Sequence, residues 1–298
     1  MTYSEIWHRI ATSYDDGEAR AIARILIEEL FGLSYADIVC GATEQLSADD
    51  TLRLDTAVRR IEQGEPLQHV LGYADFCGNR FCVNGSVLIP RPETEWLVDE
   101  GAKLMGATAT SSPKRILDIG TGSGCIAISL KLRLGDAYVE AWDISEEALR
   151  TAQNNADALK AEVVFRKRDA LRADNTAAPW DLIVSNPPYI CDSERSAMDD
   201  NVLLHEPHTA LFVPDDDPLR FYRAIARYAL LTLNIGGSLL FECNTRYAEA
   251  TGAMLRDMGF EEVTVSDDCF SLPRFVRGSS PSQPSPSGRA WLPRLRKA

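Results

Sequence analysis

The sequence predicts an α/β protein in which a parallel sheet carries helices on both faces and a small helical domain precedes it. Three observations predict this fold class. Short apolar, strand-like runs alternate with helical patterns between residues 115 and 242. A glycine-rich loop, Gly120 to Gly124, directly follows the first of these runs. Residues 1–70 show helical spacing without a strand-like run.

The composition limits the classes of protein that fit. With 298 residues, of which 45% are hydrophobic, the chain can bury an α/β core and a second, smaller domain. Its formal net charge of -13 disfavours a nucleic-acid substrate, because such a surface repels a phosphate backbone. The seven cysteines are scattered without a C-x-x-C pair, so no metal site is predicted.

The N-terminal sequence does not predict export. Glu5, His8 and Arg9 lie where a signal peptide needs an unbroken apolar stretch. No window approaches the roughly eighteen apolar residues that a membrane-spanning helix requires. We therefore expect a cytoplasmic protein without a membrane partner, and we expect it to be a monomer.

The helical domain is assigned to residues 1–70. Its apolar residues follow the three-four spacing of an amphipathic helix at Ile22, Ile25, Leu26 and Leu30. Residues 71–92 are predicted to form a hairpin linker, because Gly78-Asn79 and Asn84-Gly85 punctuate apolar runs that end with Val87-Leu88-Ile89. Pro92 then fits the first turn of a new helix.

The larger domain is predicted over residues 93–277. Strands are expected at 115–119, 138–142, 162–166, 181–185, 238–242, 263–265 and 274–276. Helices are expected between them at 125–134, 146–159, 219–233 and 247–258. From residue 278 the composition changes to Ser, Pro, Gly and Gln, which predicts a disordered tail over 278–298.

The glycine loop has the sequence Gly120-Thr121-Gly122-Ser123-Gly124, between a predicted strand and a predicted helix. Glycines let the backbone approach a ligand at positions where side chains would collide. Cys125 occupies the position where a dinucleotide fingerprint has its third glycine. This spacing disfavours NAD and suits a cofactor without a pyrophosphate, such as S-adenosylmethionine.

Two further acidic positions are predicted to lie at the carboxyl edge of the sheet. Asp143 follows the loop by about twenty residues, where a carboxylate can accept both ribose hydroxyls of an adenosine ligand. The alternative for Asp143 is an N-cap of the next helix. Asp169-Ala170 follows the third strand, and both adenine contact and a solvated loop aspartate remain open there.

The tetrapeptide Asn186-Pro187-Pro188-Tyr189 ends a buried-strand pattern and is the most specific signal in the chain. The prolines fix φ and hold the loop extended before a substrate arrives. The Asn186 side-chain oxygen and the Pro187 carbonyl can each accept one hydrogen of an NH₂ group, which would orient a planar nitrogen toward a methyl donor. Tyr189 can stack on the flat substrate group. This scheme requires no general base, so His205 and His208 are not assigned catalytic roles.

These residues together resemble the HemK/PrmC family, the release-factor glutamine methyltransferases, up to about residue 278. The matching segments are 71–76, 87–95, 120–127 and 185–190. The resemblance implies a Rossmann-like class I S-adenosylmethionine-dependent methyltransferase sheet of seven strands, with an N-terminal domain that helps to dock the release factor. The implied reaction places a methyl group on the side-chain amide nitrogen, N5, of the glutamine in the Gly-Gly-Gln motif.

The same likeness implies roles for individual residues. Those expected to contact the cofactor are Gly120, Thr121, Gly122, Ser123, Gly124, Asp143, Asp169, Ala170 and Asn186. Those expected to hold the glutamine are Asn186, Pro187, Pro188 and Tyr189, with Asn186, Pro187 and Tyr189 as the catalytic set. The sequence departs from the family's pattern at Ala170 and at residues 213–217, after Glu206-Pro207.

Three other functions compete with this interpretation. A nucleic-acid amino methyltransferase of the adenine N6 type would use the same tetrapeptide on a flipped base, but the acidic charge and the absence of a target-recognition domain disfavour it. A nicotinamide-dependent oxidoreductase fits Asp143 but neither Cys125 nor the tetrapeptide. A non-catalytic adaptor would not need an intact tetrapeptide.

Overall fold

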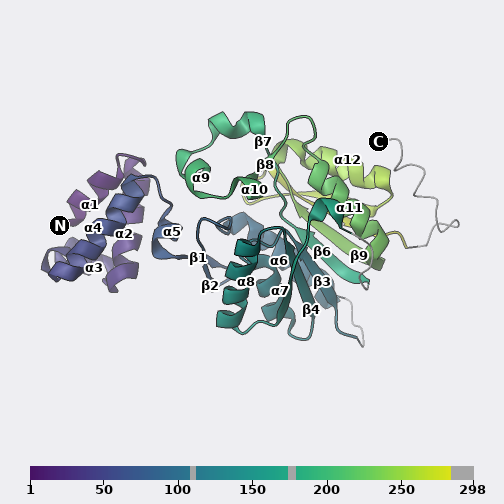
Figure 1. Cartoon of the computed structure of the whole chain (residues 1–298), viewed down its shortest axis with the longest axis horizontal. Coiled ribbons are helices and arrows are strands. Elements are labelled where there is room, and N and C mark those ends of the chain that lie inside the picture. Colours follow the sequence, from purple (N-terminus) through teal and green to yellow (C-terminus); the bar gives the residue numbers. More distant parts are fainter. Residues whose placement is uncertain (108–111, 174–178, 283–298) are drawn as a thin grey trace.

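The computed structural model describes residues 1–107, 112–173 and 179–282. Its N-terminal part consists of helices packed around their own apolar core, beside the sheet domain (Figure 1). The helices are α1 (Tyr3–Ile10), α2 (Asp16–Phe31), α3 (Tyr35–Val39), α4 (Ala48–Glu62) and α5 (Leu67–Leu71). A 3-10 turn, η1 (Ala42–Gln45), joins α3 to α4. The helical prediction for this segment is confirmed.

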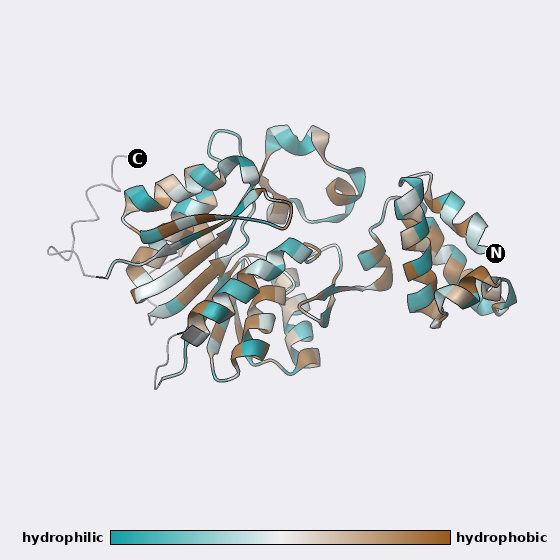
Figure 2. Ribbon diagram, turned by 180° about the vertical axis from the view of Figure 1, so that it is seen from behind, coloured by the Kyte–Doolittle hydropathy of each residue, from teal (hydrophilic) through white to brown (hydrophobic). Residues whose placement is uncertain are grey.

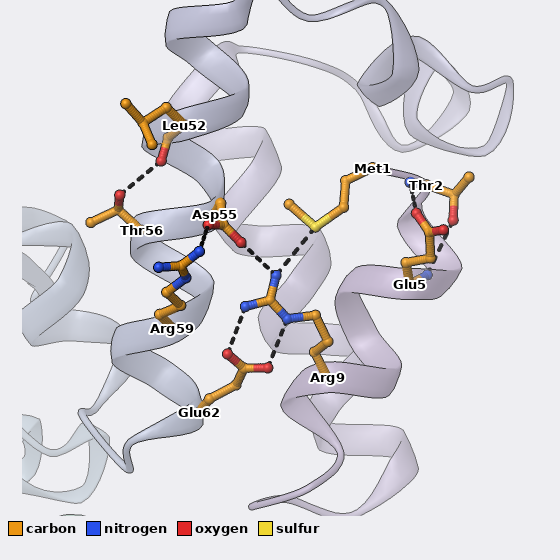
Figure 3. Close-up of polar contacts among 9 residues, drawn as sticks. All are labelled: Met1, Thr2, Glu5, Arg9, Leu52, Asp55, Thr56, Arg59 and Glu62. Carbon is orange, nitrogen blue, oxygen red and sulfur yellow. Dashed lines mark hydrogen bonds and ion pairs between the residues drawn. The ribbon is translucent and has the colours of Figure 1, made fainter.

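Arg9 ties the first helix to the fourth (Figure 3). Its guanidinium donates to both carboxylate oxygens of Glu62, at 2.7 and 2.6 Å, and to Asp55 at 2.7 Å. The paired contact with Glu62 is the fork geometry that makes arginine–carboxylate bonds strong. Hydrogen bonding to Glu62 raises the pKa of Arg9 above its ordinary value. The short helix α1 is thereby fixed on the surface of α4.

The predicted hairpin is present, but it is shorter than the sequence suggested. Strands β1 (Tyr73–Phe76) and β2 (Asn79–Cys82) pair antiparallel across Cys77-Gly78, both of which have positive φ. Two positive φ values are typical of the tight turn that matches strand twist. The expectation of a strand at 87–89 is wrong. Val87 and Ile89 instead pack against Ala148 in a small buried cluster, and the Ile89 amide donates to Glu206.

The central sheet has seven strands in the order β10-β11-β9-β6-β3-β4-β5. Their bounds are β3 (Arg115–Ile119), β4 (Tyr138–Asp143), β5 (Val163–Lys167), β6 (Trp180–Ser185), β9 (Leu233–Glu242), β10 (Glu261–Asp267) and β11 (Pro273–Ser279). The neighbouring strands β9, β6, β3, β4 and β5 run parallel, as predicted, whereas β11 runs antiparallel to both β9 and β10. A short turn joins β10 to β11, and such a turn can connect only antiparallel strands.

Helices cover both faces of the sheet, as predicted. One face carries α6 (Glu95–Ala107), α7 (Cys125–Leu134) and α8 (Glu146–Leu159), and the other carries α11 (Arg220–Thr232) and α12 (Ala248–Met258). Successive strand residues alternate between the two apolar cores, as Leu182 and Ile183 do. Figure 2 shows hydrophobic residues along the central strands and hydrophilic residues on the outer sides of the helices.

A long connection between β6 and α11 crosses the carboxyl end of the sheet. It contains β7 (Ile190–Cys191), η4 (Asp192–Ala197), α9 (Asp200–His205), α10 (His208–Leu211) and β8 (Phe212–Val213). Strands β7 and β8 pair with each other, which closes the base of this excursion. Figure 1 places α9 on the side of the sheet domain that faces the N-terminal helices.

The ordered chain extends beyond the predicted start of the tail at residue 278. Gly278 and Ser279 belong to β11, where they pair with Leu239 and Ser238 of β9. The Ser280 amide then donates to the Gly237 carbonyl at 2.8 Å. The remainder of the predicted tail, residues 283–298, lies outside the described residues. Within the described ranges, no helix combines the length and the apolar character needed to cross a membrane.

Candidate active site

A cavity of about 340 Å³ opens at the carboxyl ends of the parallel strands. It lies where the chain order reverses, because β4 and β5 extend to one side of β3 and β6 lies on the other. Ligands of open α/β sheets bind at such a switch point. The cavity brings together seven of the residues predicted from the sequence: Gly120, Asp143, Asp169, Ala170, Asn186, Pro187 and Pro188. Thr121, Gly122, Ser123, Gly124 and Tyr189 are not part of its lining.

Strand pairing places the glycine loop beside the tetrapeptide. Ile119 of β3 lies opposite Ser185 of β6, and the Ser185 hydroxyl donates to the Ile119 carbonyl at 2.6 Å. Gly120 directly follows the last residue of β3, and Asn186 directly follows the last residue of β6. A Cβ added to Gly120, which has φ of +78°, would lie 3.9 Å from the Asn186 carbonyl oxygen. The two motifs are therefore neighbours although 66 residues separate the bonded pair.

Asp143 connects the glycine loop to the start of α8. Its Oδ2 accepts the Gly122 amide at 2.9 Å, and its Oδ1 accepts the Ser145 amide at 2.8 Å. The N-cap of α8 is Ser145, whose hydroxyl accepts the Ala148 amide, so the N-cap alternative for Asp143 is wrong. Burial raises the pKa of the Asp143 carboxyl. The residue lies on the cavity wall with further lone pairs available to a ligand.

Gly124 is explained by packing rather than by ligand approach. A Cβ at this position would lie 2.8 Å from Ile128 Cδ1 and 3.1 Å from the Cβ of Ala152. Gly124 has φ of +83° and precedes the first residue of α7. Only glycine lets α7 and α8 approach this closely with that backbone conformation. Its predicted cofactor contact stays a prediction.

Asp118 is a residue that the sequence interpretation did not single out. It lies on β3 with no exposed surface, and its Oδ2 accepts the Thr121 hydroxyl at 2.6 Å. Its Oδ1 has no hydrogen-bond partner within the described part of the chain. Burial raises the pKa of this carboxyl to about 7. The sequence did contain a signal for Asp118, because an aspartate in an otherwise apolar buried strand is costly unless its carboxyl group is hydrogen-bonded or paired.

Asp169 and Ala170 line the cavity at the end of β5. Asp169 caps the turn η3 (Ala170–Arg172) by accepting the Leu171 amide at 2.9 Å. The side chain is half-buried, with 30% of its surface exposed, and it also lies 3.6 Å from the Arg172 guanidinium. The Ala170 methyl packs against the apolar core beneath α11. Asp169 is therefore a fixed part of the cavity wall rather than a fully solvated loop residue.

The tetrapeptide is held at both ends. The Asn186 side-chain amide donates to the Thr94 hydroxyl at 3.4 Å. The Tyr189 hydroxyl donates to Glu242 at 3.2 Å, and burial raises the Tyr189 pKa well above its ordinary value. Because Tyr189 does not line the cavity, its proposed stacking on a substrate stays a prediction.

One further part of the cavity wall comes from the long connection and α11. Its residues are Thr209, Ala210, Phe212, Arg220, Phe221 and Ile225. The helical pattern of α11 is visible in the sequence, but the pattern does not reveal which end of the helix faces a cavity. The departure from the family's pattern at 213–217 starts at β8, whose pairing with β7 positions this wall.

Residues 91–95 fasten three separate segments around the cavity. The Arg91 guanidinium binds Glu206 of the long connection, and the Thr94 hydroxyl binds Glu242 of β9. The Glu95 carboxylate accepts the Cys77 amide of the hairpin turn at 2.6 Å. This short stretch therefore joins the linker, the sheet and the wall of the cavity.

The strand order and the cavity at its switch point define a class I methyltransferase fold. The chain matches the family described as "Methyltransferase small domain" over residues 95–211 and the "PrmC N-terminal domain" over residues 8–72. Among solved structures, the hMettl16 catalytic domain is similar, with a TM-score of 0.53 and 18% identity over 80% of this chain and 83% of that chain. This likeness shows the fold alone.

Curated relatives identify the family within that class. A release factor glutamine methyltransferase of Bacteroides thetaiotaomicron is 44% identical over 264 residues, which cover 88% of this chain and 93% of the relative. A protein of the same name from Flavobacterium psychrophilum is 37% identical over 272 residues, or 90% of this chain and 94% of the relative. The chain belongs to the release factor glutamine methyltransferase family.

Proposed function

We propose that this protein transfers a methyl group from S-adenosylmethionine to the side-chain amide nitrogen, N5, of the glutamine in the Gly-Gly-Gln motif of peptide chain release factors. The relatives' names support this substrate. The observation that carries the proposal is that Gly120 and Asn186 directly follow the ends of two adjacent strands and line one cavity. A cofactor at the glycine loop and an amide at the tetrapeptide would therefore lie within reach of each other.

The residues of the cavity fit S-adenosylmethionine. The cavity volume of about 340 Å³ falls within the range of small-molecule sites. Asp143 offers carboxylate oxygens to the ribose hydroxyls, and Asp169 offers an acceptor to the adenine amino group. Ile144, Leu171 and Phe221 provide apolar surface for the adenine ring. When bound, this cofactor supplies a methyl group on a positively charged sulfur that keeps the electron pair of the broken bond.

The chain's own residues bind and orient the glutamine amide. The Asn186 Oδ1 and the Pro187 carbonyl accept the two N–H hydrogens of the substrate. Both acceptors precede a proline, so the loop is rigid before the substrate binds. An amide nitrogen is a weak nucleophile because its lone pair is delocalised, and fixed acceptors help to localise that pair toward the methyl donor. The methylated nitrogen then loses one proton to water, so no side chain needs to act as a base.

We also propose that residues 1–70 help to dock the release factor and that the protein works in the cytoplasm, where its substrate functions in translation. The N-terminal helices lie on the side of the sheet domain that carries α9 (Figure 1). A protein substrate can contact both parts while its glutamine enters the cavity. The family match to the N-terminal domain over residues 8–72 supports this division of the chain.

Mass spectrometry of a release factor incubated with the purified protein and S-adenosylmethionine tests the proposal. The expected result is one added methyl group on the Gly-Gly-Gln glutamine, and none on a release factor in which that glutamine is alanine. An oligonucleotide serves as the second substrate, because a nucleic-acid amino methyltransferase would modify it instead. Absence of transfer to the release factor by protein that binds the cofactor would overturn the proposal.

A further inference from the structure

One buried carboxylate, that of Glu242 at the end of β9, accepts hydrogen bonds connected to both ends of the tetrapeptide. Its Oε2 accepts the Thr94 hydroxyl at 2.7 Å, and its Oε1 accepts the Tyr189 hydroxyl at 3.2 Å. Glu242 has no exposed surface. Thr94 in turn contacts the Asn186 amide, so Glu242 reaches Asn186 through one intervening hydroxyl.

The direction of these hydrogen bonds determines which atom of Asn186 faces Thr94. A hydroxyl carries a single hydrogen, and the short bond to Glu242 uses the hydrogen of Thr94. Thr94 therefore presents only lone pairs to Asn186, at 3.4 Å, so the Asn186 NH₂ group faces it. The Asn186 Oδ1, on the opposite side of the same planar group, is left as the acceptor that a substrate N–H requires.

Neighbouring charged groups do not replace this arrangement. Arg274 of β11 is close to Glu242 but directs its guanidinium to Asp268, at 2.7 Å. On the other side, the Asn244 side-chain amide holds the Tyr189 carbonyl at 3.2 Å. Thr94 is thus the polar group that connects the Glu242 carboxylate with Asn186 among the described residues.

We propose that Thr94 and Glu242 are positioning residues that orient the Asn186 side chain so that its oxygen, rather than its NH₂ group, faces the substrate amide. This inference rests on the proposed function, because it assigns a purpose to the orientation of Asn186. Neither Thr94 nor Glu242 lines the cavity, so they act through Asn186 and not on the substrate.

Thr94→Val and Thr94→Ser distinguish an orienting hydroxyl from simple packing. Valine keeps the shape of threonine and removes the hydroxyl, whereas serine keeps the hydroxyl. We expect Thr94→Val to lower kcat for release-factor methylation on the order of ten- to a hundred-fold, because misoriented reacting groups are costly. Thr94→Ser should restore turnover, and calorimetry should show unchanged affinity for S-adenosylhomocysteine in both variants.

Thr232→Val is the matched control. Thr232 is also buried and donates its hydroxyl to the Tyr228 carbonyl at 2.8 Å, but it lies at the opposite end of the sheet, next to the first residue of β9. Its replacement should leave kcat unchanged. Wild-type turnover by Thr94→Val, or an equal loss in the valine and serine variants, would overturn the inference.

A second pair of measurements tests the link from Thr94 to Glu242. Because both residues act through one chain of hydrogen bonds, the double variant Thr94→Val/Glu242→Gln should lose no more turnover than the worse single variant. Losses that multiply would contradict a shared role.

Wild-type kcat should also rise with pH through the titration of Glu242, and Glu242→Gln should remove that rise. The groups that face Glu242 in this titration are Thr94 and Glu93 of η2 (Pro92–Thr94), Arg274 and Tyr189.

A readout without a release factor separates failure of this inference from failure of the proposed function. The ¹⁵N-labelled NH₂ group of Asn186, assigned by its loss in Asn186→Asp, reports its hydrogen-bond partner by NMR. Its signal should shift in Thr94→Val and return in Thr94→Ser. If this pattern holds while the wild type methylates no release factor, the function fails and the orientation stands. If the NMR signal of the Asn186 NH₂ group is the same in Thr94→Val as in the wild type, the proposed orientation by Thr94 is refuted.

Discussion

The Arg91 guanidinium donates to the carboxylate of Glu206 at 2.5 Å, joining residues that lie 115 positions apart in the chain. The Glu206 side chain is only 1% exposed, whereas Arg91 is 32% exposed. The second Glu206 oxygen accepts the Ile89 amide at 3.1 Å. This pair fastens the long connection, which forms one wall of the cavity, to the linker that follows the hairpin.

Removal of Arg91 should destabilise the protein, because it leaves the buried Glu206 carboxylate without its cation. We expect Arg91→Met to lower the free energy of unfolding by about 3 kcal/mol in urea denaturation. Arg150→Met is the control, since the pair of Arg150 with Glu147 is mostly exposed and contributes little. Equal stability of the two variants would contradict a stabilising role for the Arg91–Glu206 pair.

Loss of Asn186 should remove catalysis while the cofactor still binds. Asn186→Ala deletes one of the two proposed acceptors of the glutamine amide but leaves Asp143 and the glycine loop in place. We expect turnover to fall by about 100-fold or more, as for a lost oxyanion-hole donor. Calorimetry with S-adenosylhomocysteine should show nearly unchanged affinity. Near-normal turnover would refute the role assigned to Asn186.

Asp143 should affect the cofactor first. Asp143→Ala removes the proposed ribose acceptor and also the acceptor for the Gly122 and Ser145 amides. We expect the affinity for S-adenosylhomocysteine to fall by about 10- to 100-fold, since a hydrogen bond to a charged group contributes about 1.5–3 kcal/mol. Asp157→Ala, on the exposed side of α8, is the control. Unchanged affinity of Asp143→Ala would count against ribose binding.

The buried Asp118 predicts how stability changes with pH. Its pKa is raised from an ordinary 3.8 to about 7 in the folded protein. The folded state therefore holds its proton longer than the unfolded state does, and the stability that this provides is full below pH 3.8 and is lost as pH rises to about 7. Compared with the wild type, Asp118→Asn should lose less stability over this interval. If the unfolding free energies of the wild type and Asp118→Asn, measured by urea denaturation, change in parallel with pH, the raised pKa of Asp118 is excluded.

Gly122 and Gly124 should respond differently to alanine. A Cβ at Gly124 meets Ile128 at 2.8 Å, whereas a Cβ at Gly122 meets nothing within 4 Å, although both glycines have positive φ. We expect Gly124→Ala to cost about 1–3 kcal/mol more of unfolding free energy than Gly122→Ala, because overpacking adds to backbone strain. Thermal or urea unfolding of the two variants measures the difference, and similar losses would argue against the packing role.

Local patterns predicted most of the sheet domain. The helices at 125–134 and 146–159 begin and end where expected, because local signals define them: Gly124 and Gly135 bound the first, and amphipathic spacing marks the second. The apolar run at 87–89 led to the wrong prediction of a strand, because its residues are apolar for burial against α8 and not for strand pairing. The antiparallel edge depends on the connection between β10 and β11, which hydrophobic alternation does not encode.

The candidate site was predicted where its residues follow strand ends and was missed where it depends on distant partners. Asn186, Asp143 and Gly120 come directly after strands, so topology alone gathers them. Glu242 was predicted only as the last residue of a strand, and its contact with Thr94 spans 148 positions. A partnership of that separation leaves no pattern in one sequence.

The separation between Thr94 and Glu242 also bears on how the working protein is made. During synthesis, the glycine loop and the tetrapeptide emerge before β9 does. Pairings between distant segments form slowly because the intervening chain must first be closed into a loop. The final arrangement around Asn186 therefore requires β9 to dock, so in a refolding experiment we expect recovered turnover to lag behind formation of the N-terminal helices.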